Sequence, residues 1–161
     1  MTKSFTSTRS VPRWLVAMTA LLLAARIVVA VAPARHEPDL VKWRTPAEAV
    51  VEAQTSGRPV MYVFSAGWCP PCRQLDHGVL HDEKCAAFIN EHFIPVHAMD
   101  RRSEDGHNAP EIDALMQRFK IESFPQIVID APGVEPRVMN GYGGKRPAMA
   151  FLQGKVRKHE D

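Results

Sequence analysis

Hydrophobic residues along this chain fall into two patterns, short continuous runs and positions spaced by three or four. Continuous runs are typical of buried strands, whereas the wider spacing is typical of helices that bury one face. The runs predict strands at residues 60–65, 93–99, 126–130 and 137–139. The spaced positions predict helices that begin near Pro46, Pro71, Asp82, Glu111 and Pro147. Alternating helices and strands predict one α/β domain built around a single sheet.

The first of these helices carries clear start and stop signals. Thr45 suits the N-cap, Glu48 completes a capping box three residues later, and Gly57 ends the helix. Its buried face is expected to consist of Ala47, Val50, Val51 and Gln54. The helix capped by Asp82 is expected to bury Cys85, Phe88, Ile89 and then Phe93, and the last helix Met149, Phe151, Leu152 and Val156. The polar stretch 101–110 predicts an exposed loop.

The N-terminal residues indicate a targeting segment. Three basic residues precede an apolar stretch at 14–25, as in a secretory signal, and residues 30–32 fit the small-x-small pattern of a cleavage site. The stretch 14–34 is also long enough for an uncleaved membrane anchor. Either alternative places the domain outside the cytoplasm, in the periplasm or beyond. The expected boundaries are a signal or anchor over 1–34, a linker over 35–42 and the folded domain over 43–161.

Charge is distributed unevenly along the 161 residues, whose net charge is +2. Residues 1–32 carry four basic and no acidic side chains, which leaves 16 basic and 18 acidic residues in the remainder. The domain is therefore close to −2 and offers no basic face for nucleic acid.

The segment Trp68-Cys69-Pro70-Pro71-Cys72 is the strongest chemical signal in the chain. Two cysteines three residues apart can form and reopen a small disulfide ring, and here they follow a predicted strand and open a predicted helix. The first-turn N–H groups of such a helix stabilise a thiolate. Half of a zinc site is the alternative, but zinc needs two more cysteine or histidine ligands at suitable spacing and only Cys85 remains among the cysteines.

This pattern resembles the thioredoxin superfamily, most closely the thioredoxin-like domain of periplasmic membrane proteins that reduce disulfides. The residues that carry the resemblance are the Trp-Cys-Pro-Pro-Cys segment, Phe124-Pro125 and Gly141, with Pro125 56 positions after Cys69. The resemblance covers about residues 43–153. It implies an α/β thioredoxin fold, with a central mixed sheet flanked by helices.

The resemblance also implies roles for individual residues. Cys69 would be the exposed nucleophile that attacks a substrate disulfide, and Cys72 would resolve the mixed disulfide. Pro125 would follow a cis peptide bond and lie against the cysteines, while Trp68, Phe124 and Gly141 would line the substrate groove. No cofactor beyond the two cysteines is implied. The expected partners are protein thiols or disulfides and a membrane electron donor.

Two departures from the family pattern bear on the chemistry. The family often has a buried carboxylate six residues before the first cysteine, and here that residue is Val63. Proton transfer to and from Cys72 must then use water or another group. Pro70 and Pro71 remove two N–H donors from the neighbourhood of Cys69, which favours a less acidic thiol and a reducing role.

Other readings of the same residues remain open. A copper-binding chaperone with this fold would use Cys69 and Cys72 and a distant histidine, for which His97 and His107 are the candidates. A pure interaction module would keep the disulfide idle. His77, His81 and Cys85 are spaced by four and could form a metal site, but solvated surface histidines are the default. Cys85 itself is expected to be an inert core thiol.

Overall fold

The computed structural model describes residues 12, 14–19, 21–22 and 39–154 of the chain. In the N-terminal unit, residues 14–19 and 21–22 are helical. No helix among the described residues has the length and apolar character needed to cross a membrane. The predicted cleavage pattern at 30–32, most of the possible anchor, the linker residues 35–38 and Val156 lie outside the described residues.

The second compact unit begins at Asp39, earlier than expected. Val41 is only 2% exposed and belongs to the core, with Leu40 packed against it. Residues 39–42 are therefore part of the folded unit, and the prediction of a linker over 35–42 extended too far. An apolar pair within a polar, proline-containing stretch gave too weak a pattern to show this.

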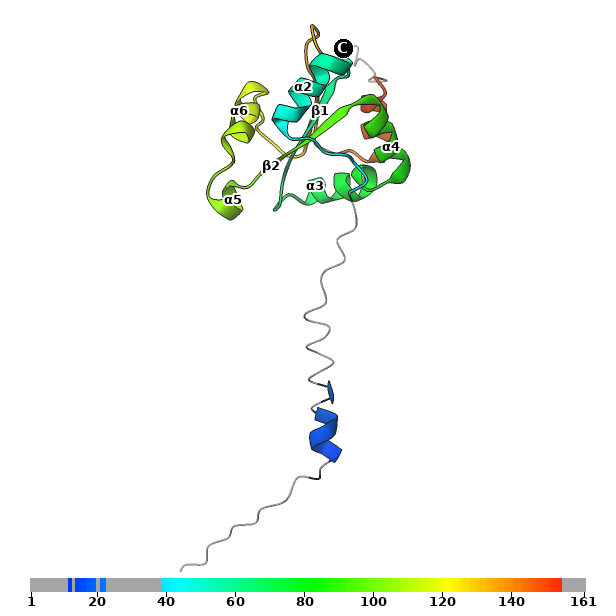
Figure 1. The fold of residues 1–161 in the computed structure, drawn as a ribbon, viewed down its shortest axis with the longest axis vertical. Coiled ribbons are helices and arrows are strands. Elements are labelled where there is room, and N and C mark those ends of the chain that lie inside the picture. The colour runs from blue at the N-terminus through cyan, green and yellow to red at the C-terminus, as the bar shows by residue number, and fades with distance from the viewer. Residues whose placement is uncertain (1–11, 13, 20, 23–38, 155–161) are drawn as a thin grey trace, which may run out of the picture. The chain divides into compact units, whose positions relative to one another are not determined.

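The folded unit alternates helices and strands in the predicted order, with additional helical turns (Figure 1). The helices are α2 (Pro46–Ser56), α3 (Pro70–Leu75), the π-helix η1 (Asp76–Leu80), α4 (Glu83–His92), α5 (Arg102–Asp105), α6 (Pro110–Arg118) and α7 (Lys145–Leu152). The strands are β1 (Val60–Ala66), β2 (Ile94–Asp100), β3 (Gln126–Asp130) and β4 (Arg137–Asn140).

The four strands form one mixed sheet in the order β2-β1-β3-β4. β1 pairs parallel with β2, beginning at Val60 opposite Ile94, and antiparallel with β3. β4 pairs antiparallel with β3 and lies at one edge. The predicted central mixed sheet is confirmed, and β1 is placed so that its C-terminal end delivers the Cys-Pro-Pro-Cys segment.

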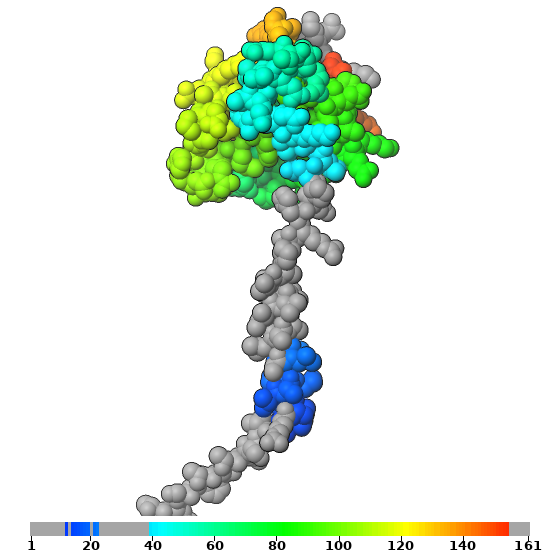
Figure 2. Space-filling view, in the orientation of Figure 1, coloured from blue at the N-terminus to red at the C-terminus, as the bar shows by residue number. Residues whose placement is uncertain are grey.

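Helices cover both faces of the sheet, which gives the core two layers. Because successive residues of a strand point to opposite faces, Met61 and Val63 pack toward α3, η1, α4 and α7. Tyr62 and Phe64 pack on the other face, toward α2 and α6. Figure 2 shows α2 and the segment before it on the surface, with α6 on one side and α4 on the other. β1 is therefore buried on both faces.

The helix caps follow the sequence signals, but the buried face of α2 differs from the prediction. Thr45 and Glu48 form the capping box, and Gly57 ends the helix in the left-handed region. The buried residues are Ala49 and Ala53, whereas Val50 is 45% exposed and Val51 61% exposed. Two alanines four residues apart let the helix lie close to the sheet, so the smaller residues, and not the valines, mark the contact.

The stretch 101–110 is not the simple exposed loop that was predicted. It contains the short helix α5, and Asn108 is buried. The Asn108 side chain accepts a hydrogen bond of 2.7 Å from the Arg101 N–H and donates one of 2.9 Å to Asp113. Asn108 thus links the start of this segment to α6. The polar composition of the segment did not show that one of its polar residues would be buried.

The helix that follows the cysteines continues through Gly78 as η1, which ends at Leu80. A side chain at residue 78 would not fit, because a Cβ there would lie 2.4 Å from the hydroxyl oxygen of Tyr142. Gly78 therefore lets the 140s loop pack directly against η1.

We expect Gly78→Ala to destabilise the protein by about 1–3 kcal/mol, the usual cost of overpacking. Urea unfolding followed by circular dichroism measures the change. In a Tyr142→Phe background the clashing oxygen is gone, and the same substitution should cost less. If Gly78→Ala lowers the free energy of unfolding equally in both backgrounds, contact with the Tyr142 hydroxyl is not the reason that residue 78 must be glycine.

Candidate active site

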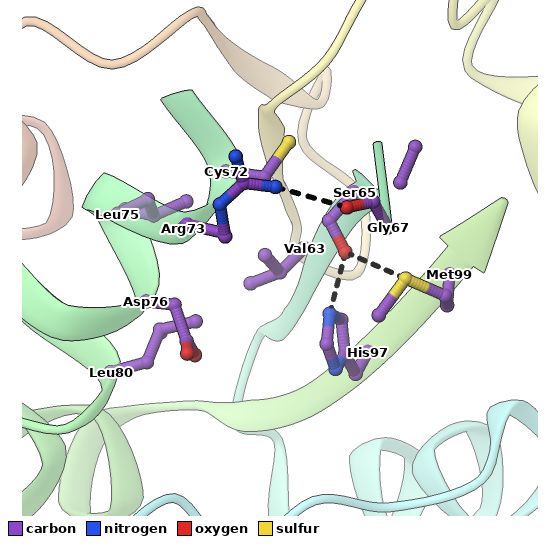
Figure 3. A pocket seen from close by; sticks show the side chains of 11 residues that line it. Val63, Ser65, Gly67, Cys72, Arg73, Leu75, Asp76, Leu80, His97 and Met99 are labelled. Atoms are coloured by element: carbon purple, nitrogen blue, oxygen red, sulfur yellow. Dashed lines mark hydrogen bonds between the residues drawn. The ribbon is translucent and has the colours of Figure 1, made fainter. Parts of the chain in front are cut away.

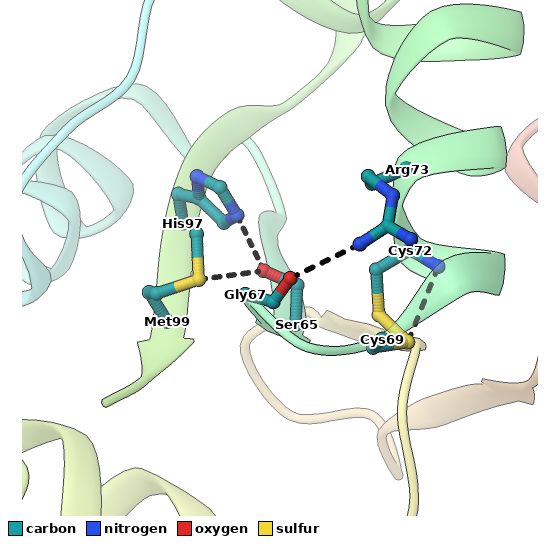
Figure 4. The surroundings of a disulfide bond; sticks show 7 residues. All are labelled: Ser65, Gly67, Cys69, Cys72, Arg73, His97 and Met99. Atoms are coloured by element: carbon teal, nitrogen blue, oxygen red, sulfur yellow. Dashed lines mark hydrogen bonds between the residues drawn. A yellow bond between two sulfur atoms is a disulfide. The ribbon is translucent and has the colours of Figure 1, made fainter. Parts of the chain in front are cut away.

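The two cysteines of the Cys-Pro-Pro-Cys segment form a disulfide at the start of α3, with their Cα atoms 5.3 Å apart (Figure 4). Cys69 is the N-cap residue, and its sulfur accepts a hydrogen bond of 3.2 Å from the backbone N–H of Cys72. Pro70 and Pro71 occupy the first two helical positions, where a missing N–H disturbs no helical hydrogen bond. The predicted helix start is confirmed, and Cys69 lies at its edge.

Both cysteines are buried, which corrects the expectation of an exposed Cys69. Cys69 is 2% exposed and Cys72 is 7% exposed, and both pack with Ala66 and Phe124. Trp68 is itself 56% exposed, and its ring meets that of Phe124 edge to face with centroids 6.1 Å apart. In the disulfide form both cysteines are thus shielded from solvent, with Phe124 packed against them and Trp68 against Phe124.

The loop before β3 completes the surroundings of the disulfide. The Phe124–Pro125 peptide bond is cis, and the Pro125 side chain is fully buried. The backbone N–H of Gly141 donates a 2.8 Å hydrogen bond to the carbonyl of Pro125. Gly141 has φ of +72°, a conformation that glycine adopts without strain. The structure thus brings together Trp68, Phe124, Pro125 and Gly141, the residues proposed from the family pattern.

A pocket of about 150 Å³ lies behind the disulfide, next to Val63 (Figure 3). Its walls include Cys72 and Arg73 from α3, and Ser65 and His97 from the sheet. Val63, where the family often has a carboxylate, lines this pocket as an apolar residue. Arg73 is exposed, and its guanidinium donates a 3.3 Å hydrogen bond to the Gly67 carbonyl.

Ser65 and His97 form a polar pair within this pocket. The Ser65 hydroxyl and His97 Nε2 are joined by a 2.7 Å hydrogen bond, and the hydroxyl also lies 3.5 Å from the Met99 sulfur. Figure 3 shows these side chains pointing toward one another. Trp43 stacks on the imidazole with ring centroids 5.0 Å apart. Burial lowers the pKa of His97, while the carboxylates of Asp76 and Asp39 act in the opposite direction.

Sequence reasoning assigned no role in thiol chemistry to His97 and set Ser65 aside. A usable signal was present in the strand register, because His97 lies opposite Val63 and Met99 lies opposite Ser65. Residues opposite each other, or two apart in one strand, share a face of the sheet. Both Ser65 and His97 therefore had to face α3, on the same side as Val63.

The remaining thiol and the other histidines lie apart from this chemistry. Cys85 is buried in α4, and burial raises the pKa of its thiol, with the nearby carboxylate of Asp82 acting in the same direction. The rings of His77 and His81 lie 6.2 Å apart. Among the described residues, no three histidine, cysteine or acidic side chains are arranged to hold a metal ion.

Comparison with known sequences places this arrangement in a family. A family model described as a thioredoxin-like domain matches residues 46–153, which include all the site residues above except Trp43 and Asp39. Thioredoxin H5 of Arabidopsis thaliana is 29% identical over 86 residues, or 53% of this chain. The match covers 62% of the length of that protein.

Solved structures show the same fold. A DsbH oxidoreductase superposes with a TM-score of 0.62 at 19% identity, covering 79% of this chain and 94% of its own. A thioredoxin from Thermus thermophilus gives 0.53 at 24% identity, covering 74% and 98%. The C-terminal domain of Neisseria meningitidis DsbD gives 0.51 at 15% identity, covering 68% and 90%. At these identities the likeness confirms the predicted thioredoxin fold.

Proposed function

The chain belongs to the thioredoxin-like domain family, and on that premise we propose that it is a thiol–disulfide oxidoreductase that reduces protein disulfides outside the cytoplasm. The observation that carries the proposal is the Cys69–Cys72 disulfide at the start of α3, between Trp68 and the Phe124-Pro125 loop. A pair of cysteines that closes a disulfide in the fold can also donate two electrons to another disulfide.

In the proposed reaction the thiolate of Cys69 attacks a substrate sulfur, which forms a mixed disulfide and releases the first substrate thiol. The thiolate of Cys72 then attacks the Cys69 sulfur, closes the protein disulfide and releases the second substrate thiol. Two electrons pass from the protein to the substrate. Trp68 and Phe124 provide an aromatic surface for the substrate chain, and the buried Pro125 has no N–H that could compete for the sulfurs.

The reducing direction is supported by the weak stabilisation available to a Cys69 thiolate. A strong oxidant has a greatly stabilised thiolate, because this favours its reduced form. Here Pro70 and Pro71 supply no N–H, and the described contact to the Cys69 sulfur is the single N–H of Cys72. A thiol stabilised so little holds its electrons weakly and donates them to substrates.

The N-terminal segment supports the proposed location. Its basic residues and apolar stretch support export of the domain, with cleavage or with retention as an anchor. Outside the cytoplasm a reductant must be kept reduced against an oxidising environment. We therefore include a membrane protein that supplies electrons to Cys69 and Cys72 as the proposed partner.

Two measurements test this function. The purified protein should catalyse the reduction of insulin by dithiothreitol, and its redox titration should give a potential below that of the glutathione couple. In Pro70→His, an added donor beside Cys69 should lower the thiol pKa and raise the potential, by about 30 mV for each tenfold change in the equilibrium constant. A wild-type potential above the glutathione couple would instead indicate an oxidase or isomerase.

The copper-chaperone alternative is decided on the same protein preparation. Copper or zinc that copurifies in stoichiometric amount, together with absence of insulin reduction, would favour a metal carrier that uses Cys69 and Cys72. Insulin reduction that requires both Cys69 and Cys72 would exclude the copper chaperone. It would also exclude an interaction module in which the disulfide takes no part in chemistry.

A further inference from the structure

The pocket behind the disulfide contains a hydrogen-bonded pair of polar side chains, Ser65 and His97, beside the apolar Val63. Val63 and Leu75 line it together with Cys72, Ser65 and the half-buried His97. Even partial burial of an imidazole costs free energy unless its ring nitrogens find hydrogen-bond partners. Its Nε2 is held at 2.7 Å from a hydroxyl that shares a pocket with Cys72.

The resolving step needs a proton acceptor at this position. Cys72 is 7% exposed, so bulk water has poor access to its thiol, yet only its thiolate can attack Cys69. No carboxylate occupies residue 63. A pocket of about 150 Å³ has room for water molecules that bridge the thiol to the nearest polar side chains.

We propose that His97, acting through Ser65 and water in this pocket, accepts the proton of Cys72 when the mixed disulfide is resolved. This inference rests on the proposed thiol–disulfide exchange. The thiol of Cys72 gives its proton to water, water passes one to the Ser65 hydroxyl, and the hydroxyl passes its own to His97 Nε2. The Cys72 thiolate then forms the bond to Cys69 while the substrate sulfur leaves with the electron pair. The imidazolium returns its proton to solvent.

The geometry suits each transfer. The Ser65 hydroxyl hydrogen can rotate between the Met99 sulfur and His97 Nε2, since both lie within hydrogen-bonding distance of the same oxygen. Burial keeps the pKa of His97 below its ordinary value, so the imidazole is neutral near pH 7 and its nitrogen can accept a proton. Stacking on Trp43 fixes the ring.

The charged groups that act on His97 or share its pocket are two carboxylates and one guanidinium. Asp76 of η1 and Asp39 act on it as negative charges and help to stabilise the imidazolium once it forms. Both carboxylates also face His81, at 3.2 Å and 3.8 Å. Arg73 lines the pocket but is a cation that cannot accept a proton. Asp76 also lines the pocket and is the competing acceptor.

The test separates the two chemical steps with an aromatic disulfide, 5,5′-dithiobis(2-nitrobenzoate). The first thionitrobenzoate is released when Cys69 attacks, and the second when Cys72 resolves the adduct, so stopped-flow absorbance gives both rates. We expect His97→Gln to leave the first rate unchanged and to slow the second at pH 7. The expected slowing is about tenfold to a hundredfold, because a general base contributes about 10²–10⁴ and a thiol retains a few per cent thiolate near neutrality.

The pH profile distinguishes proton transfer from a structural effect. In the wild type the second rate should level off above the pKa of His97. In His97→Gln it should keep rising with pH until Cys72 ionises unaided, so that the difference between the two proteins closes at alkaline pH. Ser65→Ala should behave in the same way, and His92→Gln, at an exposed histidine on α4, should match the wild type.

Each other result overturns an identifiable part of the argument. A His97→Gln deficit that stays constant across pH would make His97 a structural residue. A slow second step in Asp76→Asn, with His97→Gln normal, would assign the proton to Asp76. Loss of the first release in the wild type would contradict the proposed function itself, whereas a normal first release with an unaffected second release in His97→Gln would remove only the relay.

Discussion

Replacing Cys69 by Ser should abolish thiol–disulfide exchange, whereas replacing Cys72 by Ser should trap mixed disulfides with substrate proteins. Cys69 caps α3, and its sulfur meets the N–H of Cys72, so it is the sulfur whose thiolate the helix start stabilises. Without Cys72 the first attack still occurs, but nothing releases the bound substrate. Insulin reduction measures the loss, and non-reducing electrophoresis with mass spectrometry measures the trapped adduct.

The pair of variants also tests the assignment of roles. If Cys69→Ser traps substrate and Cys72→Ser does not, the nucleophile is Cys72 and the order of the two attacks is reversed. Cys85→Ala is the matched control, because it removes a buried thiol of raised pKa. It should reduce insulin at the wild-type rate and form no adduct.

Phe64→Ala should be among the most destabilising single changes in the chain, at about 3–5 kcal/mol. The Phe64 side chain is fully buried on the α2 and α6 face of the sheet. Its ring lies 6.2 Å from that of Tyr62 and 6.1 Å from that of Phe119. Truncation removes the buried area and leaves a cavity between strand and helix. Because a domain is stable by only about 5–15 kcal/mol, urea unfolding should show a greatly lowered midpoint.

Two matched variants give the scale of this loss. Phe64→Leu keeps most of the volume and should cost less than half as much. Val138→Ala removes a side chain that is 44% exposed on the edge strand and should change stability by less than about 0.5 kcal/mol. Equal losses in Phe64→Ala and Val138→Ala would contradict the two-layer core described here.

The fold was largely predictable because its local signals agree with one another. The strand at 126–130 is observed with the predicted bounds, and Thr45 and Asp82 cap their helices as expected. These features depend on periodicity and on hydrogen bonds between residues close in sequence. Such interactions can be derived without knowing the tertiary structure.

The features that were missed depend on contacts between distant residues. Cys69 is buried because the loop of Phe124, 55 positions later, packs against it. Tyr142 lies against η1 at Gly78, a contact between residues 64 positions apart that no local pattern shows. The role proposed for His97 depends on the strand register, which places this residue in the pocket behind Cys72.

The two outer strands also bear on how the protein avoids self-association. An exposed strand edge offers unpaired backbone groups to other chains, which is a common route to aggregation. The outer side of β2 is covered, since Arg44 bridges to Val96 and donates a 2.8 Å hydrogen bond to the carbonyl of Pro95. Pro95 has no N–H to offer there. The opposite edge, β4, has only four residues and begins with a cationic Arg137. Neither of these two edges therefore gives a second molecule a long template for sheet extension.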